Sequence, residues 1–144
     1  MSYLARLAVE LAFGAVGIPP EKKDRHRRFV LAAQNPDGGF ANREGQSDAY
    51  YTGFALRGLM LIGGVPETVA GPVRGFIQEQ LASSPEPIDF LSLVFCDLIL
   101  QATDGQTVFD SADARRDAFE RIVAPLARGD GRIKIGRASC RERV

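Results

Sequence analysis

The residues of this sequence that could do chemistry gather in one apolar stretch near its middle, which runs from Asp48 to Arg57. Aromatic side chains bury a large area and suit the wall of a dry pocket, whereas arginine binds phosphate oxygens bidentately. The candidates for a substrate cavity are therefore Asp48, Tyr50, Tyr51, Thr52, Phe54 and Arg57. For such residues the commoner outcomes are core packing of the aromatic rings and, for Arg57, either an ion pair with a carboxylate such as Asp97 or a side chain that reaches out at a helix end.

The elements that must position these residues are helices. Apolar residues recur at helical spacing, and Gly or Pro separates the segments, so we expect helices over residues 2–17, 21–34, 47–62, 66–83, 88–103 and 111–127. Ser111 is a plausible N-cap of the last one. No segment shows sustained period-two alternation, and the predicted fold class is all-α.

Two kinds of helix alternate along the chain. The second, fourth and sixth carry charges on one face, and in the second we expect Phe29, Val30 and Ala33 to be buried. The third and fifth are apolar nearly all round, which predicts burial on every side by a layer of outer helices. The fifth contributes Asp89, Phe90 and Phe95 as further candidates for a cavity wall.

A period of 46–47 residues supports this layering. Val30, Ile77 and Val123 occupy like places in "RRFVLAA", "RGFIQEQ" and "ERIVAPL", at spacings of 47 and 46 residues. A period of this length, with one helical hairpin in each unit, is typical of stacked or closed α-repeat arrays.

The turn between the second and third helices, "QNPDGGF", carries a family resemblance. The outer-helix Phe29, the run Gln34, Asp37, Gly38, Gly39, Phe40 and the small and aromatic residues up to Gly63 resemble one repeat of the prenyltransferase and squalene-cyclase superfamily. The resemblance implies an α/α toroid, with an inner ring of helices inside an outer ring and a central apolar cavity. Bacterial proteins similar to the β subunit of protein geranylgeranyltransferase look closest, which implies isoprenoid transfer to a thiol.

Gln34, Asp37, Gly38, Gly39 and Phe40 have structural explanations in this turn. Both glycines permit positive φ, Asp37 can accept backbone N–H bonds, and Gln34 can bond the helix end of the neighbouring unit. We expect Phe40 to fill the seam between units. The motif is therefore predicted to be structural, and no catalytic residue is assigned.

The resemblance also implies chemistry that these residues do not match. Family prenyltransferases hold zinc with Asp, Cys and His, as Asp-x-Cys and a histidine at the start of an inner helix, but Asp89 and Cys96 are seven residues apart. Tyr51 stands in the place of that histidine, and His26 belongs to an outer helix. We assign no zinc ligand here, zinc remains possible in a full-length protein, and Cys96 is expected to be a small buried residue.

Triterpene cyclases of the superfamily use an acidic cluster to protonate an alkene. Asp110, Asp113 and Asp117 come at the start of a charged helix, where carboxylates complement the helix dipole. Two other functions stay open: a non-catalytic toroid that binds a lipid or a protein partner, and, more distantly, a terpene cyclase. The expected ligand is an isoprenoid diphosphate or another lipid, and a protein partner is possible.

The last ten residues, 135–144, resemble a translated short-read sequencing adapter. We therefore expect residues 1–134 to be the toroid repeats of an inactive N-terminal fragment, and residues 135–144 to be a disordered artefact. Residues 1–134 have 15 basic and 17 acidic side chains, a net charge of −2, which argues against nucleic-acid binding. Within residues 1–134 there is one cysteine, Cys96, and its single thiol, together with the lack of a signal peptide or an apolar span, predicts a cytoplasmic protein.

Overall fold

The structure, a computed structural model, describes residues 3–83, 85–109 and 111–123, so the adapter-like segment 135–144 and Asp110 lie outside the described residues. The described residues are mostly helical, which confirms the predicted all-α class. The elements are α1 (Tyr3–Val16), α2 (Pro20–Leu31), β1 (Phe40–Ala41), β2 (Ser47–Asp48), α3 (Ala49–Leu61), α4 (Glu67–Ala82), α5 (Pro87–Asp104) and α6 (Ala112–Val123).

The helix boundaries lie close to those expected from periodicity, and the two-residue strands are the one element that periodicity missed. β1 pairs antiparallel with β2, with Phe40 opposite Asp48. The Ser111 hydroxyl accepts the Ala114 N–H at 3.0 Å, which confirms the predicted N-cap of α6. The two short strands pair within the loop that leads from α2 through the glycine turn into α3.

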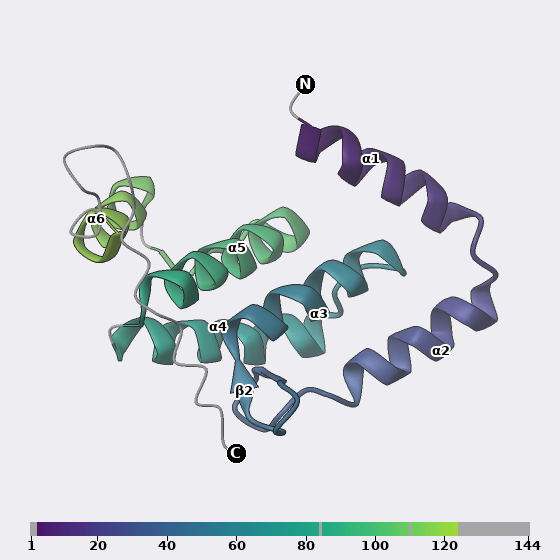
Figure 1. Ribbon diagram of the computed structural model, residues 1–144, viewed down its shortest axis with the longest axis horizontal. Coiled ribbons are helices and arrows are strands. Elements are labelled where there is room, and N and C mark those ends of the chain that lie inside the picture. Colours follow the sequence, from purple (N-terminus) through teal and green to yellow (C-terminus); the bar gives the residue numbers. More distant parts are fainter. Residues whose placement is uncertain (1–2, 84, 110, 124–144) are drawn as a thin grey trace, which may run out of the picture.

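The helices alternate in direction (Figure 1). α1, α3 and α5 run the same way, and α2 and α4 run back. α3 packs most closely against α5, while α1 and α2 also contact α3 and both α4 and α6 contact α5. Helices that are not consecutive in sequence therefore form the central contacts, and the intervening helices lie against them.

The core lies where α3, α4 and α5 meet. Each helix contributes residues at helical spacing, and the largest of them are Leu56 and Leu59 of α3, Val73, Phe76 and Ile77 of α4, and Leu93 and Leu100 of α5. Burying one such side chain contributes about 1.5–3 kcal/mol. This cluster fixes the position of α3 relative to α5, and with it the outward faces of both helices.

The prediction that the third and fifth helices are buried on every side is wrong. Each buries one face and exposes large apolar side chains on the other, with Tyr50, Phe54 and Met60 on α3 and Ile88, Leu91, Phe95 and Leu98 on α5. Their remaining apolar residues already fill the contacts with α4 and with each other. The exposed rings are therefore available to a ligand or a partner.

The expected burial of Phe29 is also wrong. Its side chain is 78% exposed, and α2 has no buried residue. Val30 and Ala33 are half-buried against the core, as their side of the helix faces α3. α2 packs on the molecule through that side, and the exposed Phe29 ring lies at its edge, where it borders a shallow hollow between α2 and α3.

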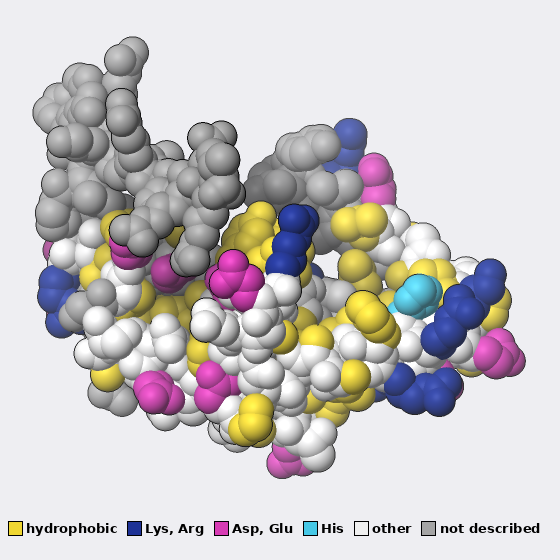
Figure 2. Space-filling view, turned by 60° about the horizontal axis from the view of Figure 1, so that its bottom comes forward, with side chains coloured by type: hydrophobic (Ala, Val, Ile, Leu, Met, Phe, Trp, Pro, Cys, Tyr) yellow, Lys and Arg dark blue, Asp and Glu magenta, His cyan; other side chains and the backbone are white. Residues whose placement is uncertain are grey.

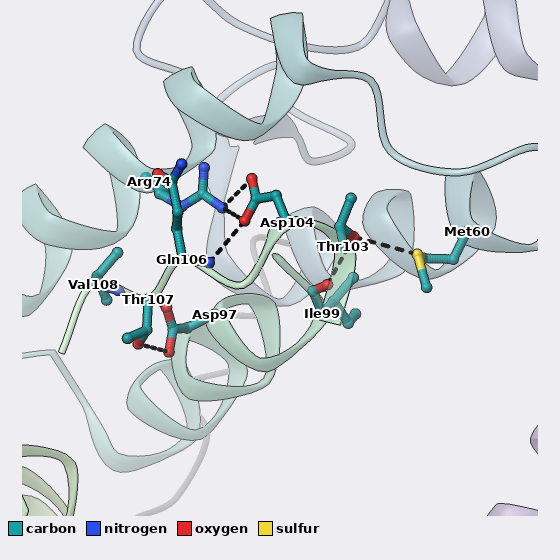
Figure 3. A network of polar contacts seen from close by, with 9 residues as sticks. All are labelled: Met60, Arg74, Asp97, Ile99, Thr103, Asp104, Gln106, Thr107 and Val108. Carbon is teal, nitrogen blue, oxygen red and sulfur yellow. Dashed lines mark hydrogen bonds and ion pairs between the residues drawn. The ribbon is translucent and has the colours of Figure 1, made fainter. Parts of the chain in front are cut away.

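A buried carboxylate ties the loop after α5 to α6. Asp97 is fully buried and accepts hydrogen bonds from the Thr107 hydroxyl at 2.7 Å and the Val108 N–H at 2.8 Å, as Figure 3 shows. Arg115 of α6 completes the site with an ion pair of 2.9 Å. The expected pairing of Arg57 with Asp97 is therefore wrong, since Arg115 occupies that place.

A second polar contact closes the same end of the bundle. One terminal nitrogen of Arg74 in α4 lies 2.5 and 2.6 Å from the two carboxylate oxygens of Asp104, and the Gln106 N–H donates to that carboxylate at 3.0 Å (Figure 3). The Gln106 N–H and then Arg74 hold the pKa of the Asp104 carboxyl below its usual value. α4 and the end of α5 are thereby joined by charge as well as by packing.

Candidate functional site

The glycine turn has the internal hydrogen bonds expected of a structural motif. Asp37 accepts the Gly39 N–H at 3.0 Å and the Ser47 hydroxyl at 2.6 Å, which confirms its predicted role. Gln34 donates to the Gly38 carbonyl oxygen at 3.1 Å, so it bonds its own turn and not the helix end of a neighbouring unit. A side-chain amide four residues from its acceptor closes the turn more directly than one that must reach another unit.

The two glycines of this turn are required for different reasons. Gly38 has a φ of +91°, and a Cβ on it would lie 2.0 Å from the Pro72 carbonyl oxygen of α4. Gly39 does not need positive φ, but a Cβ there would lie 2.8 Å from the Phe76 ring. Phe40 is buried in the core beside these contacts, so the turn joins the α2–α3 hairpin to α4.

Two of the six cavity candidates serve to start α3. Asp48 is its N-cap and accepts the Tyr51 N–H at 3.0 Å. The Thr52 hydroxyl is fully buried, donates to the Asp48 carbonyl oxygen at 2.7 Å and accepts the Phe40 N–H at 2.9 Å. These polar groups hold β1 against α3, and the Thr52 hydroxyl is not presented to a ligand.

Three other candidates lie together on an exposed surface, which we call the aromatic face. It consists of Tyr50, Phe54 and Arg57 of α3 with Leu91 and Phe95 of α5. The Tyr50 and Phe54 rings meet edge-on with centroids 4.7 Å apart. Tyr51 is half-buried and lines a shallow hollow beside this face, between α2 and α3.

Arg57 lies in the middle of the aromatic face. Its guanidinium carbon is 4.1 Å from the centroid of the Phe95 ring and 5.2 Å from that of Phe54. Such cation–π contacts contribute about 0.5–1 kcal/mol at exposed sites. No carboxylate in the described part of the chain forms an ion pair with Arg57. The face is therefore apolar with a single stacked cation.

Carboxylates lie at one end of the aromatic face, where α3 and α5 begin. Burial raises the pKa of the Asp89 carboxyl, and the nearby charges of Asp48 and then Glu86 raise it further. Negative charge at this end disfavours an anionic group there. An anion that binds the face is therefore directed to Arg57.

Cys96 behaves as the predicted buried residue. It is fully buried between α3 and α5, with its sulfur 3.8 Å from the Ala49 carbonyl oxygen. Among the described residues, no group of three or more His, Cys, Asp and Glu side chains could hold a metal ion. The described residues do not fit a zinc site. The Cys96 thiol is fully buried, and Asp89 is seven residues before it on the same helix.

We expect Cys96 to resist alkylation in the folded protein. Burial raises the pKa of its thiol to about 12, so the reactive thiolate is scarce at neutral pH. Peptide mapping after treatment with iodoacetamide should show Cys96 modified about a hundredfold more slowly in native buffer than in urea. Equal rates in the two conditions would contradict the enclosed position of the sulfur.

The acidic residues weighed for a cyclase do not form a site among the described residues. Asp113 is exposed and pairs with Arg116 on the same helix, and Asp117 is exposed one turn later. Asp110 lies outside the described residues. Asp113 is in the first turn of α6, as expected for a carboxylate that complements a helix dipole.

His26 is an exposed residue of α2. It borders an open groove of about 430 Å³ between α1, α2 and α3, otherwise lined mainly by apolar residues that include Leu11, Val30 and Leu61. One carboxylate, Glu10, also borders this groove. Neither the groove nor the histidine was singled out as a site by the sequence.

Comparison with known proteins adds no relative. The chain matches no protein-family model, and neither curated proteins nor solved structures gave a significant match. No described helix combines the length and apolar character that crossing a bilayer requires.

Proposed function

We propose that the aromatic face is part of the wall of an isoprenoid-binding cavity in an α/α toroid. The complete protein would then resemble the β subunit of a protein geranylgeranyltransferase, which transfers an isoprenoid to a thiol. The single observation that carries the proposal is the exposed cluster of Tyr50, Phe54 and Phe95 around Arg57. Exposed rings on helices whose other faces are buried are unusual unless something apolar covers them.

The helix arrangement supports the toroid part of this proposal. α3 and α5 run nearly parallel, α1 runs in the same general direction at a wide angle to them, and α2 and α4 run back, as expected for the helices of successive hairpins (Figure 1). The glycine turn with Gly38 and Gly39 joins one hairpin to the outer helix of the next. In this arrangement the aromatic face belongs to the inner helices and borders the central cavity.

The chemistry of the face fits an isoprenoid diphosphate. Prenyl units are flat and apolar, so they can lie on aromatic rings and displace water from them. The Arg57 guanidinium lies over the Phe95 ring and is exposed, and its N–H groups can donate to phosphate oxygens. The carboxylates at the start of α3 and α5 would keep the diphosphate away from that end.

The second candidate is a toroid that binds a lipid or a protein partner without chemistry. It is favoured by one observation: among the described residues, no group of three or more His, Cys, Asp and Glu side chains could hold the metal ion that family prenyl transfer uses. Label transfer from geranylgeranyl diphosphate to a thiol peptide by the complete protein, with zinc present, distinguishes the two. Transfer would exclude the non-catalytic alternative, and tight binding without transfer would support it.

We expect Phe54→Ala and Phe95→Ala each to weaken binding of geranylgeranyl diphosphate about tenfold, because each removes ring surface that the prenyl chain would cover. Isothermal titration calorimetry measures this directly. Phe119→Ala on α6 is the matched control, since Phe119 is 44% exposed, close to the 43% of Phe95. Equal losses in all three variants, or no binding by the unaltered chain, would contradict the proposal.

A further inference from the structure

A second surface, distinct from the aromatic face, runs along the exposed side chains of α2. Lys22, Arg25, His26 and Phe29 are all exposed there, and we call them the basic strip. Positions 22, 25, 26 and 29 share one side of a helix because they follow the i, i+3, i+4, i+7 spacing. Figure 2 shows a group of dark blue side chains on this side of the molecule, next to the chain's only histidine in cyan.

The charge of the strip contrasts with the rest of the chain. α2 has five basic and two acidic residues, a net charge of +3, whereas residues 1–134 together have a net charge of −2. The opposite side of α2 is occupied by the fold, since Arg27 donates to the Gly64 carbonyl oxygen at 2.9 Å and Val30 packs on the core. Within the described residues, neither Lys22 nor Arg25 forms an ion pair or a side-chain hydrogen bond, so the fold does not occupy these two cations.

We propose that the basic strip docks the protein on a bilayer that contains anionic lipids. Lys and Arg near such a surface contribute about 1 kcal/mol each, and an apolar residue between them can enter the boundary of head groups and acyl chains. Phe29 supplies that residue, because its ring is 78% exposed amid the cations.

Phe29 is the reason to choose a bilayer over an acidic protein. A large exposed ring gains nothing from carboxylates on a partner, whereas it gains from insertion among acyl chains. The ring also opens a shallow hollow of about 240 Å³ that is lined by apolar and aromatic side chains and reaches Phe54. Apolar surface therefore continues from the basic strip to the aromatic face.

Co-sedimentation of the full chain with lipid vesicles tests this proposal. We expect binding to vesicles that contain phosphatidylserine, none to vesicles of phosphatidylcholine alone, and a decline as salt is raised. Lys22→Ala together with Arg25→Ala should weaken binding about thirtyfold, and Phe29→Ala about fivefold. Arg116→Ala with Arg121→Ala on α6 removes the same charge elsewhere and should change binding by less than about twofold.

The other outcomes overturn the proposal. Equal losses in the strip and control variants would show that only net charge matters. Binding to polyglutamate but not to phosphatidylserine vesicles would make the strip a site for acidic macromolecules. Alanine is a good helix former, and circular dichroism checks that α2 persists in the variants. Vesicle binding does not use Arg57 or Phe95, so its failure leaves the isoprenoid proposal standing, and the reverse also holds.

Discussion

Replacing Gly38 by alanine should destabilise the protein by about 3–5 kcal/mol, a large part of the stability of a small domain. Two effects add at this position. Its φ of +91° is strained for a residue with a side chain, and the new Cβ would lie 2.0 Å from the Pro72 carbonyl oxygen. Because the clash is with backbone, the turn or α4 itself must move. Urea unfolding followed by circular dichroism measures the change in free energy.

Gly45→Ala is the matched control for this experiment. Gly45 also has positive φ, +84°, but a Cβ there would meet nothing within 4 Å. Gly45→Ala should therefore lower the free energy of unfolding by only the backbone strain, about 1 kcal/mol. If both variants lost the same stability, the close contact between Gly38 and Pro72 of α4 would not contribute to the effect, which would contradict the packing of the glycine turn on α4.

Replacing Asp97 by asparagine should destabilise the protein by about 3 kcal/mol. The substitution keeps the size of the side chain but removes the charge that pairs with Arg115, and it turns an amide toward a guanidinium. The Thr107 hydroxyl and the Val108 N–H also lose a charged acceptor. Part of the loss is recovered because Arg115 is partly exposed and can turn to water. Urea unfolding again measures the effect.

Asp113→Asn is the control for the charge itself. Its carboxylate pairs with Arg116 on the surface of α6, where an ion pair contributes little, and the change should stay below about 0.5 kcal/mol. Hydrogen exchange adds a local test, since the Val108 amide should exchange faster in Asp97→Asn than in Asp113→Asn. An unchanged Val108 rate would contradict the role of Asp97 in holding this loop.

The helices and the glycine turn could be predicted because their signals are local. The periodic apolar residues, the Ser111 cap and the Asp37 turn each depend on neighbours in sequence, and the structure places them as expected. The faces of the helices were harder to predict. An all-round apolar helix such as α3 indicates burial without telling which side meets another helix, so the pattern alone did not separate the buried Leu56 from the exposed Met60.

Arg57 and Asp97 are the two charged residues deep within the apolar helices α3 and α5, and helical spacing could have shown that they lie in different environments. Asp97 is four residues after Leu93 and three before Leu100, within the stripe that enters the core, whereas Arg57 follows Phe54 by three on the exposed stripe of α3. The spacing therefore places Asp97 on the buried side of α5 and Arg57 on the exposed side of α3. The actual partner of Asp97, Arg115, is 18 residues away across a loop, and no local pattern predicts that contact.

The most direct test of the central claim is photo-crosslinking with a diazirine analogue of geranylgeranyl diphosphate, followed by peptide mapping. If the aromatic face is the isoprenoid wall, label should appear on α3 and α5 around Phe54 and Phe95, and unmodified geranylgeranyl diphosphate should compete it away. Label spread over α1, α2 and α6 without competition would show that the probe adheres to exposed apolar surface, and the proposed cavity wall would be wrong.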